Sequence, residues 1–212
     1  MRIDKCDCSK GMDEACTRAA MDAAEDISRG RLVVYPTDTV YGIGADIYNE
    51  AAVKGLYLAK QRPFDMPLSV AVADRRMMEE VAEINENADR LIEAFLPGPL
   101  TMIIRKRGDV PDIVTASSQK VGVRIPNHPL AVEIARRAGP LVATSANTHF
   151  HPDATNIGMA VRAFGDSVST YVDAGESPIG KPSTIVWLKG SEYEIVRQGE
   201  ITEEMIRDVL QC

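Results

Sequence analysis

The residues of this chain best suited to chemistry are cations and hydroxyls. Lys60 and Arg62 stand together in LAKQRPFDMPL, where a predicted helix ends before Pro63. A lysine offers a compact charge and an arginine a planar fork, so the pair suits a polyphosphate. Basic residues are also common at helix C-termini, where they offset the helix dipole, and spacing alone favours that structural interpretation.

Two stretches rich in hydroxyls each follow a predicted buried strand. PTDT (36–39) follows LVVY, and SAN (145–147) follows PLVAT. Ligands of open α/β sheets usually bind outside the carboxyl ends of strands, although strand ends also need turn residues for purely structural reasons. Two polar ends pointing the same way predict a ligand site that includes Thr37, Ser145 and Asn147.

Two arginines lie within strand-like segments. Arg124 stands in VGVRIP and Arg197 in YEIVRQG. An arginine among β-branched residues is costly unless it is paired, either with a carboxylate of the protein or with an anionic substrate. The sequence offers several candidate carboxylates and does not choose among them: Asp38, Asp46, Asp112 and Asp173.

The usual signatures of covalent catalysis and nucleotide binding fail here. His128, His149 and His151 lie in or beside predicted loops, and no serine stands in a G-x-S-x-G elbow. GESPIGKP (175–182) fits G-x-x-x-x-G-K, but Pro182 stands where a phosphate loop needs Ser or Thr, and a strand-like segment follows instead of a helix. We therefore expect no catalytic triad and no phosphate loop.

Four cysteines occur, three of them near the start of the chain: Cys6, Cys8, Cys16 and Cys212. They form no C-x-x-C pair, and a disulfide framework is not expected in an intracellular protein. Together with the HFH triplet (149–151) they could bind a metal, but the spacing matches no zinc-ligand pattern. We expect no metal, and free thiols near a frayed terminus.

Composition bounds the class of protein. The chain has 212 residues, 45% hydrophobic and 26% charged, with a net charge of −7. These values predict one compact domain over 1–212, with its core at about 11–210, and exclude disorder. The acidic balance argues against a broad nucleic-acid-binding field. The chain starts with no signal peptide and has no apolar run of spanning length, so we expect a soluble, cytoplasmic protein without membrane contact.

The elements that position these residues alternate between helix and strand. Hydrophobic periodicity predicts helices at 12–29, 49–60, 75–84, 88–96, 129–138, 157–164 and 202–210, and strands at 31–36, 67–73, 99–106, 121–126, 140–146, 169–174, 183–189 and 193–198. The turn-rich PTDTVYGIGA (36–45) is expected to be a loop. The last three strands have few helical residues between them, which favours antiparallel pairing. The fold class is α/β, with a mixed sheet covered by helices.

Six segments in fixed order resemble the YrdC-like threonylcarbamoyl-AMP synthase family: VVYPTDTVYGIGA, LAKQRP, LPGPLT, VGVRIPNHP, TSAN and IVRQG. The resemblance runs from about Gly11 to Leu210. The family signature K-x-R followed by S-x-N is met by Lys60 and Arg62, then by Ser145 and Asn147. The chain departs from the family pattern at Met66, at Ala71 and in HPDAT (151–155).

The resemblance implies a single-domain, YrdC-like (DHBP synthase-like) fold, an open twisted mixed sheet with a concave basic cavity, in the short form of the family without an appended domain. It implies a nucleotidyltransferase that converts ATP, L-threonine and bicarbonate to threonylcarbamoyl-AMP and pyrophosphate, with Mg²⁺. This is the first step of tRNA threonylcarbamoyladenosine modification, so protein partners for transfer to tRNA are implied too. The alternative is a protein of the same fold that binds tRNA or double-stranded RNA without synthase activity.

The resemblance also assigns roles by motif. Lys60 and Arg62 would be catalytic. Contacts to L-threonine would come from Thr37, Arg124 and Ser183. Contacts to ATP would come from Lys60, Arg62, Thr115, Ser145, Asn147 and Arg197.

Overall fold

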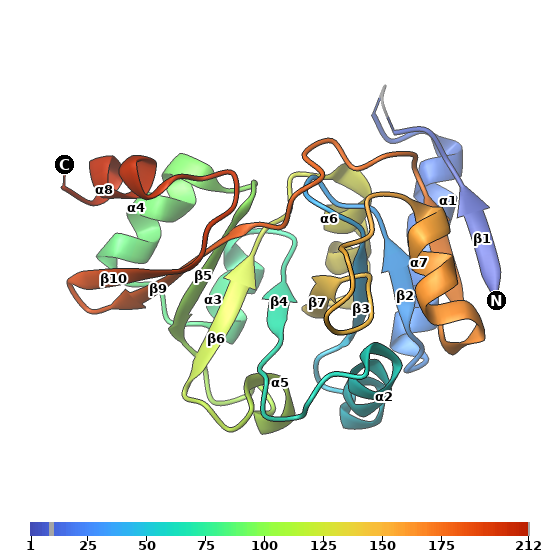
Figure 1. The fold of residues 1–212 in the computed structure, drawn as a ribbon, viewed down its shortest axis with the longest axis horizontal. Helices are drawn as coiled ribbons and strands as arrows, with labels where there is room; N and C mark the ends of the chain where they lie inside the picture. Colours follow the sequence, from blue (N-terminus) through green and yellow to red (C-terminus); the bar gives the residue numbers. More distant parts are fainter. Residues whose placement is uncertain (9–10, 212) are drawn as a thin grey trace.

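The computed structural model describes residues 1–8 and 11–211, and ten strands form a single sheet (Figure 1). The strands are β1 (Arg2–Lys5), β2 (Val33–Tyr35), β3 (Gly42–Asp46), β4 (Ser69–Ala71), β5 (Leu100–Arg105), β6 (Lys120–Arg124), β7 (Leu141–Ser145), β8 (Thr170–Asp173), β9 (Thr184–Lys189) and β10 (Glu192–Arg197). Their order is β1-β8-β2-β3-β7-β4-β6-β5-β9-β10, with both parallel and antiparallel neighbours. The predicted mixed α/β sheet is confirmed.

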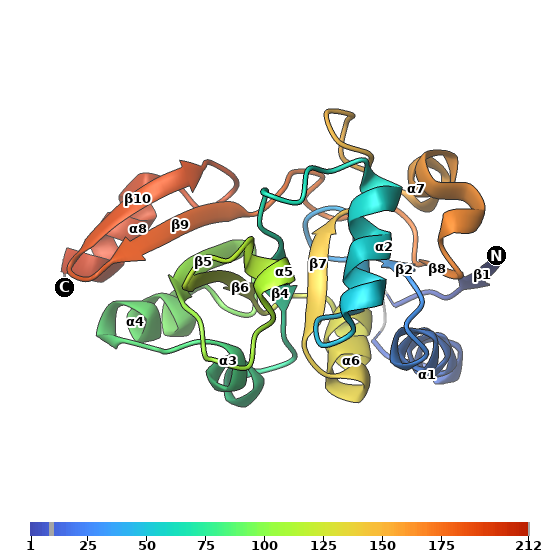
Figure 2. The ribbon, with the colours of Figure 1, turned by 90° about the horizontal axis from the view of Figure 1, so that it is seen from below.

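Helices cover both faces of this sheet. They are α1 (Glu14–Ser28), α2 (Glu50–Lys60), α3 (Arg75–Val81), α4 (Glu86–Phe95), α5 (Asp112–Thr115), α6 (Pro129–Ala138), α7 (Ile157–Phe164) and α8 (Glu203–Gln211), with a 3₁₀ turn at Gly165–Ser167. Figure 2 shows α1 and α6 on one side and α7 on the other. Two hydrophobic cores lie on opposite faces of the sheet, a smaller one that contains α1 and α6 and a larger one on the other face. Strand β2 contributes to both, because Val33 and Tyr35 pack in the smaller core and Val34 packs in the larger one.

The first helix forms as its sequence predicts. Its alanine stripe is buried, and the Asp13 side chain caps the first turn by accepting a hydrogen bond from the Cys16 N–H at 2.7 Å. Beyond the last turn, Gly30 has φ of +76°, a backbone conformation that glycine adopts at little cost. The predicted helix over 157–164 is also observed.

Two predictions at the N-terminal side were wrong. The first residues are not frayed, because β1 pairs in parallel with β8, Arg2 opposite Thr170. The segment expected to be a loop contains β3, which pairs antiparallel with both β2 and β7. Glycines usually weaken a strand, but here Gly44 leaves room for the buried ring of Tyr35. A short apolar run with two glycines concealed a central strand.

The expected antiparallel pairing of the last three strands holds only for β9 and β10. Strand β8 lies near the opposite edge of the sheet, between β1 and β2, and it is parallel to both. Strand β9 instead pairs in parallel with β5. Although these three strands are close together in the sequence, β8 and β9 pair with strands from distant parts of the chain, which sequence separation alone does not reveal.

The helices of the described residues contain none that is long and apolar enough to span a bilayer.

We predict that Gly44→Ala destabilises the protein. An added Cβ would lie 2.8 Å from Cε1 of Tyr35 and 3.2 Å from the carbonyl oxygen of Val142. Overpacking of this kind costs about 1–3 kcal/mol in unfolding free energy, measured by urea denaturation. The matched control is Gly55→Ala in α2, where nothing lies within 4 Å; this helical substitution should raise stability by about 0.5–1 kcal/mol. Equal effects at both positions would contradict the role given to Gly44.

Candidate active site

A cavity of about 250 Å³ lies against the face of the sheet. Polar and charged side chains from distant segments line it together, and they include eight of the nine residues singled out in the sequence: Thr37, Lys60, Arg62, Arg124, Ser145, Asn147, Ser183 and Arg197. Strands β2 and β7 run in the same direction, as predicted from PTDT and SAN, because both are antiparallel to β3. Strand β6, which carries Arg124, runs the opposite way, since it is parallel to β4 and β4 is antiparallel to β7.

The ammonium of Lys60 is buried at the centre of this arrangement. Its Nζ donates to the carbonyl oxygens of Ser145 at 2.5 Å and Asn147 at 2.6 Å, with Asn147 Oδ1 at 3.5 Å. Lys60 is the last residue of α2, and Gln61 follows with φ of +52°, which ends the helix and turns the chain toward Arg62. The solvated helix end considered for Lys60 is wrong, because only 2% of the residue is exposed.

The S-x-N segment is shaped to receive that ammonium. Ser145 Oγ donates to Asn147 Oδ1 at 2.5 Å, and Asn147 Nδ2 donates to the carbonyl oxygen of His151 at 2.5 Å. The backbone N–H of His149 donates to the carbonyl oxygen of Lys60 at 2.8 Å. The two halves of the K-x-R and S-x-N signature therefore form one hydrogen-bonded unit.

Burial controls the charge of this unit. Burial, followed by the positive charge of Arg62, lowers the pKa of Lys60 to about 7, although the carboxylate of Asp153 acts in the opposite direction. Burial also lowers the pKa of Arg62, which remains a cation because its ordinary pKa is so high. Arg62 donates to the carbonyl oxygens of Met66 and Pro67, which fixes its direction. An arriving anion would favour the charged form of Lys60.

Arg124 is held by the protein itself. Its Nη2 donates to Asp38 Oδ1 at 2.6 Å, its Nη1 to Thr39 Oγ1 at 2.8 Å and its Nε to the carbonyl oxygen of Gly98 at 2.9 Å. Burial lowers its pKa, and the carboxylate of Asp38 opposes that shift. A guanidinium has five N–H donors, so two remain for a ligand. Among the four carboxylates that spacing left open, the structure selects Asp38.

The hydroxyl of Thr37 is committed to its own turn. It donates to the carbonyl oxygen of Val40 at 2.6 Å and accepts from the backbone N–H of Thr39 at 3.2 Å. Its single hydrogen is thus already used. In this conformation Thr37 can meet a ligand only as an acceptor.

Ser183 and Arg197 form the wall on the far side of the cavity. Arg197 donates from Nε to the carbonyl oxygen of Ser183 at 3.0 Å and from Nη2 to its Oγ at 3.2 Å. Ser183 Oγ also lies 2.8 Å from Thr101 Oγ1. Gly199 permits this approach, because a Cβ there would lie 2.5 Å from both the carbonyl oxygen of Pro182 and the backbone N of Thr184. The glycine after Arg197 and Gln198 is therefore a packing requirement.

The prediction that Thr115 contacts the nucleotide does not agree with the structure. Thr115 is fully buried in α5, its hydroxyl lies 3.4 Å from Nζ of Lys106, and it does not line the cavity. The resemblance had assigned Thr115 to ATP, but its burial in α5 keeps its side chain away from the cavity. We remove it from the candidate set.

Two features of the lining were missed from the sequence. The hydroxyl of Tyr35 is buried at the cavity and has no hydrogen-bond partner among the described residues. At the rim, the ring of Phe150 lies 3.8 Å from that of His149, and Phe150 is 93% exposed. A tyrosine in a buried strand carries no distinguishing signal, whereas an aromatic residue within the loop after S-x-N could have been flagged as a stacking surface.

The segment GESPIGKP (175–182) is not a phosphate loop, as its sequence context predicted. GESPIGKP leads directly to β9, so there is no helix N-terminus to face a phosphate. The HFH triplet lies beside Lys60 and not with the cysteines, because the group of possible metal ligands found among the described residues consists of Cys6, Cys8 and Cys16 alone.

The fold and the cavity define an α/β protein whose site suits small anions. The family model Sua5_yciO_yrdC, described as "Telomere recombination", matches residues 25–199, and the chain belongs to this family. A Mycobacterium tuberculosis relative is 38% identical over 93% of this chain and 91% of its own. The Bacillus subtilis threonylcarbamoyl-AMP synthase is 37% identical over 89% of this chain and 55% of its own.

Solved structures agree with this assignment. Pyrococcus abyssi Sua5 complexed with L-threonine superposes with a TM-score of 0.91 at 34% identity, covering 99% of this chain and 61% of that one. Escherichia coli YciO has the same fold, with a TM-score of 0.81, and covers 93% of this chain and 94% of its own at 22% identity. The predicted family and fold are confirmed.

We predict that Asp38→Asn destabilises the protein through Arg124. The substitution keeps the shape of the side chain but removes the carboxylate that faces the buried guanidinium, where both side chains are at most 13% exposed. Removing one partner of a buried pair costs about 3 kcal/mol or more in unfolding free energy, measured by chemical denaturation. Glu25→Gln, which breaks the exposed pair with Arg29, is the control and should change stability very little. A loss no larger than that of the control would show that Arg124 does not depend on Asp38.

Proposed function

We propose that this chain is a threonylcarbamoyl-AMP synthase, a nucleotidyltransferase that uses ATP, L-threonine and bicarbonate. The observation that carries the proposal is the buried Lys60 ammonium, held by the S-x-N segment in a cavity that also receives Arg62, Arg124 and Arg197. Relatives from Bacillus subtilis and Pyrococcus abyssi bear this enzyme's name, and a Pyrococcus abyssi Sua5 structure contains L-threonine.

The chemistry explains why the site has cations and no triad. The amine of threonine adds to bicarbonate-derived carbon dioxide to give a carbamate. A carbamate oxygen attacks the α-phosphorus of ATP, the bond to the β-phosphate oxygen breaks, and pyrophosphate leaves. Because the nucleophile belongs to the substrate, the protein contributes position and charge stabilisation.

The nucleotide lies, in this proposal, on the Lys60 side of the cavity. Lys60 and Arg62 meet the phosphates, and Ser145 and Asn147 hold Lys60 in place. Arg197 has three further N–H donors for the triphosphate, because two of its five are used on Ser183. A cavity of about 250 Å³ is smaller than most small-molecule sites, which hold about 300–1,000 Å³, so the adenine would extend to the open rim and stack on Phe150.

Threonine takes the Arg124 side. The two free N–H donors of Arg124 suit its carboxylate, as a planar fork does. Ser183 Oγ is close enough to Arg197 to contact both substrates. Thr37, whose hydroxyl can only accept, would take a hydrogen bond from the amine or hydroxyl of the substrate.

Magnesium fits this site as part of the nucleotide substrate. The described residues that line the cavity include no Asp or Glu side chain, so carboxylates of the lining do not bind the ion. Mg²⁺ commonly keeps several waters and binds through substrate phosphates, and we propose that it arrives as MgATP. Its chemistry there is to offset charge on the departing pyrophosphate.

The RNA-binding alternative is not favoured. A net charge of −7 disfavours tight binding to a phosphate backbone, whereas two small anions need only the few cations that face the cavity. We propose that the product passes to protein partners that modify tRNA in the cytoplasm, and that this chain does not itself hold the tRNA.

The decisive experiment incubates the protein with ATP, L-threonine, bicarbonate and Mg²⁺ and follows pyrophosphate together with the adenylate product. We expect pyrophosphate release that requires threonine and bicarbonate. Omission of threonine is the internal control for ATP hydrolysis. If tRNA binds tightly at physiological salt while no threonine-dependent pyrophosphate forms, the RNA-binding alternative replaces the synthase.

We predict that ATP affinity falls as pH rises, because of Lys60. The free site has its Lys60 pKa at about 7, and bound phosphate raises that pKa, so binding takes up a proton above neutrality. Between about pH 7.5 and 9.5, where the terminal phosphate of ATP is already ionised, affinity should fall by up to about tenfold per pH unit. Isothermal titration at several pH values measures this slope.

Two variants distinguish the contribution of Lys60 to the pH dependence of ATP affinity from that of Arg62. Lys60→Met should bind ATP weakly with little dependence on pH in this window, because no ammonium titrates. Arg62→Met should also bind weakly but keep a slope, displaced toward higher pH, because Lys60 is still present and has lost the neighbouring charge that lowers its pKa. A slope that survives in Lys60→Met would assign the titration to another group.

A further inference from the structure

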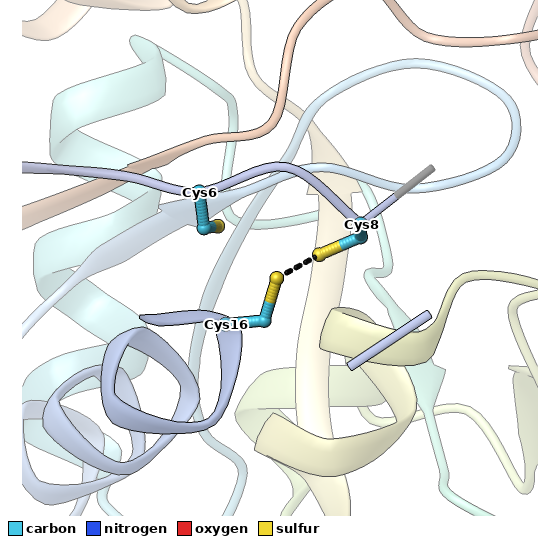
Figure 3. Close-up of side chains that lie close together, drawn as sticks. All are labelled: Cys6, Cys8 and Cys16. Atoms are coloured by element: carbon cyan, nitrogen blue, oxygen red, sulfur yellow. Dashed lines mark hydrogen bonds between the residues drawn. The ribbon is translucent and has the colours of Figure 1, made fainter. Parts of the chain in front are cut away.

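Three cysteines converge where the first strand leads to the first helix, at the edge of the molecule away from β9 and β10 (Figures 1 and 3). The Sγ atoms of Cys6, Cys8 and Cys16 all lie within 4.8 Å of one another, and those of Cys8 and Cys16 are 2.7 Å apart. Cys16 is fully buried and the other two are half-buried. None of the three lines the cavity of the active site.

Backbone structure fixes two of these cysteines from separate elements. Cys6 extends the pairing of β1 with β8, since its N–H donates to the carbonyl oxygen of Asp173 at 2.9 Å. Cys16 lies in the first turn of α1, where its N–H is bonded to Asp13 Oδ1. The cluster is therefore built by the sheet edge and the helix together, with Cys8 on the segment between them.

We propose that Cys6, Cys8 and Cys16 bind one zinc ion as three thiolates, with the fourth position open to water or a small ligand. Zinc–sulfur bonds of about 2.3 Å in tetrahedral geometry place sulfur atoms about 3.8 Å apart. Three sulfurs within 4.8 Å are close to that spacing, and the Cys8–Cys16 pair would need to separate by about 1 Å, within reach of small side-chain rotations.

The donor set selects the kind of ion. Thiolates prefer soft or borderline ions, whereas Mg²⁺ and Ca²⁺ require oxygen ligands. A cluster of several irons would distribute its thiolates over different metal atoms, farther apart than three sulfurs on one ion.

The competing interpretation is a disulfide between Cys8 and Cys16. It would leave Cys6 without a role, although its sulfur belongs to the same cluster. A single ion uses all three sulfurs, and it would fasten the edge strand β1 to helix α1.

The test is a metal titration of the reduced full-length chain after treatment with a chelator. Co²⁺, the spectroscopic substitute for zinc, should produce a thiolate-to-cobalt charge-transfer absorption that saturates at one ion per chain and disappears when Zn²⁺ is added. Zn²⁺ should also raise the thermal unfolding temperature. Absence of the charge-transfer band in the wild-type chain would overturn the proposal.

Serine variants identify the ligands. Cys6→Ser and Cys8→Ser should each weaken Zn²⁺ binding by at least about 100-fold. Loss of a residue that only supports a metal ligand costs about 10–100-fold, so a larger loss marks a direct ligand. Cys212→Ser, a cysteine far along the chain from the cluster, is the matched control and should bind as the wild type does. Circular dichroism confirms that each variant is folded, and if Cys8→Ser is not, Cys6→Ser decides.

Two further outcomes would reject the zinc site. One is unchanged affinity in a folded Cys6→Ser variant. The other is a Cys8–Cys16 disulfide found by mass spectrometry in protein purified without reductant, together with a reduced form that binds no Co²⁺.

Discussion

The structure around the cavity depends on one buried charge, the ammonium of Lys60. It joins the end of helix α2 to the end of strand β7 through the carbonyl oxygens of Ser145 and Asn147. A buried lysine is tolerated only with such partners, since desolvation otherwise drives off its proton. Its pKa of about 7 means that the charge of Lys60 responds to its surroundings, and in the proposed function a bound phosphate would favour the ammonium form.

The cations of the cavity differ in whether a carboxylate of the protein is paired with them. Arg124 is neutralised by Asp38 and oriented by Thr39, so it offers direction more than net charge. Among the described residues, the hydrogen-bond partners of Lys60 and Arg62 are carbonyl oxygens, so no carboxylate is bonded to either cation. This difference agrees with a carboxylate on one side and a polyphosphate on the other. It also explains how an acidic chain can bind anions: the relevant quantity is the local placement of a few cations, and the net charge of −7 conceals it.

The helices could be predicted from the local sequence, but the pairing of the strands could not. Helix α1 could be predicted from the helical spacing of its alanines, and the structure adds the Asp13 cap at its start. Strand β3 could not, because its glycines are explained only by the Tyr35 ring that packs against them. The partners of β8 were equally hidden, since parallel neighbours come from distant segments. The burial of Thr115, which the resemblance assigned to ATP, was hidden as well, because it depends on α5, a helix of only four residues.

The sequence by itself determined the α/β class and the family resemblance, and eight of the nine site residues that it singled out do line the cavity, because residue types and motif order are local properties. Tertiary structure alone decided that Lys60 binds to the S-x-N segment, that Asp38 is the partner of Arg124, and that the sulfur atoms of Cys6, Cys8 and Cys16 lie within 4.8 Å of one another. Each of these is a contact between segments separated in the chain. Spacing along a sequence carries no information on such distances until the sheet has brought the segments together.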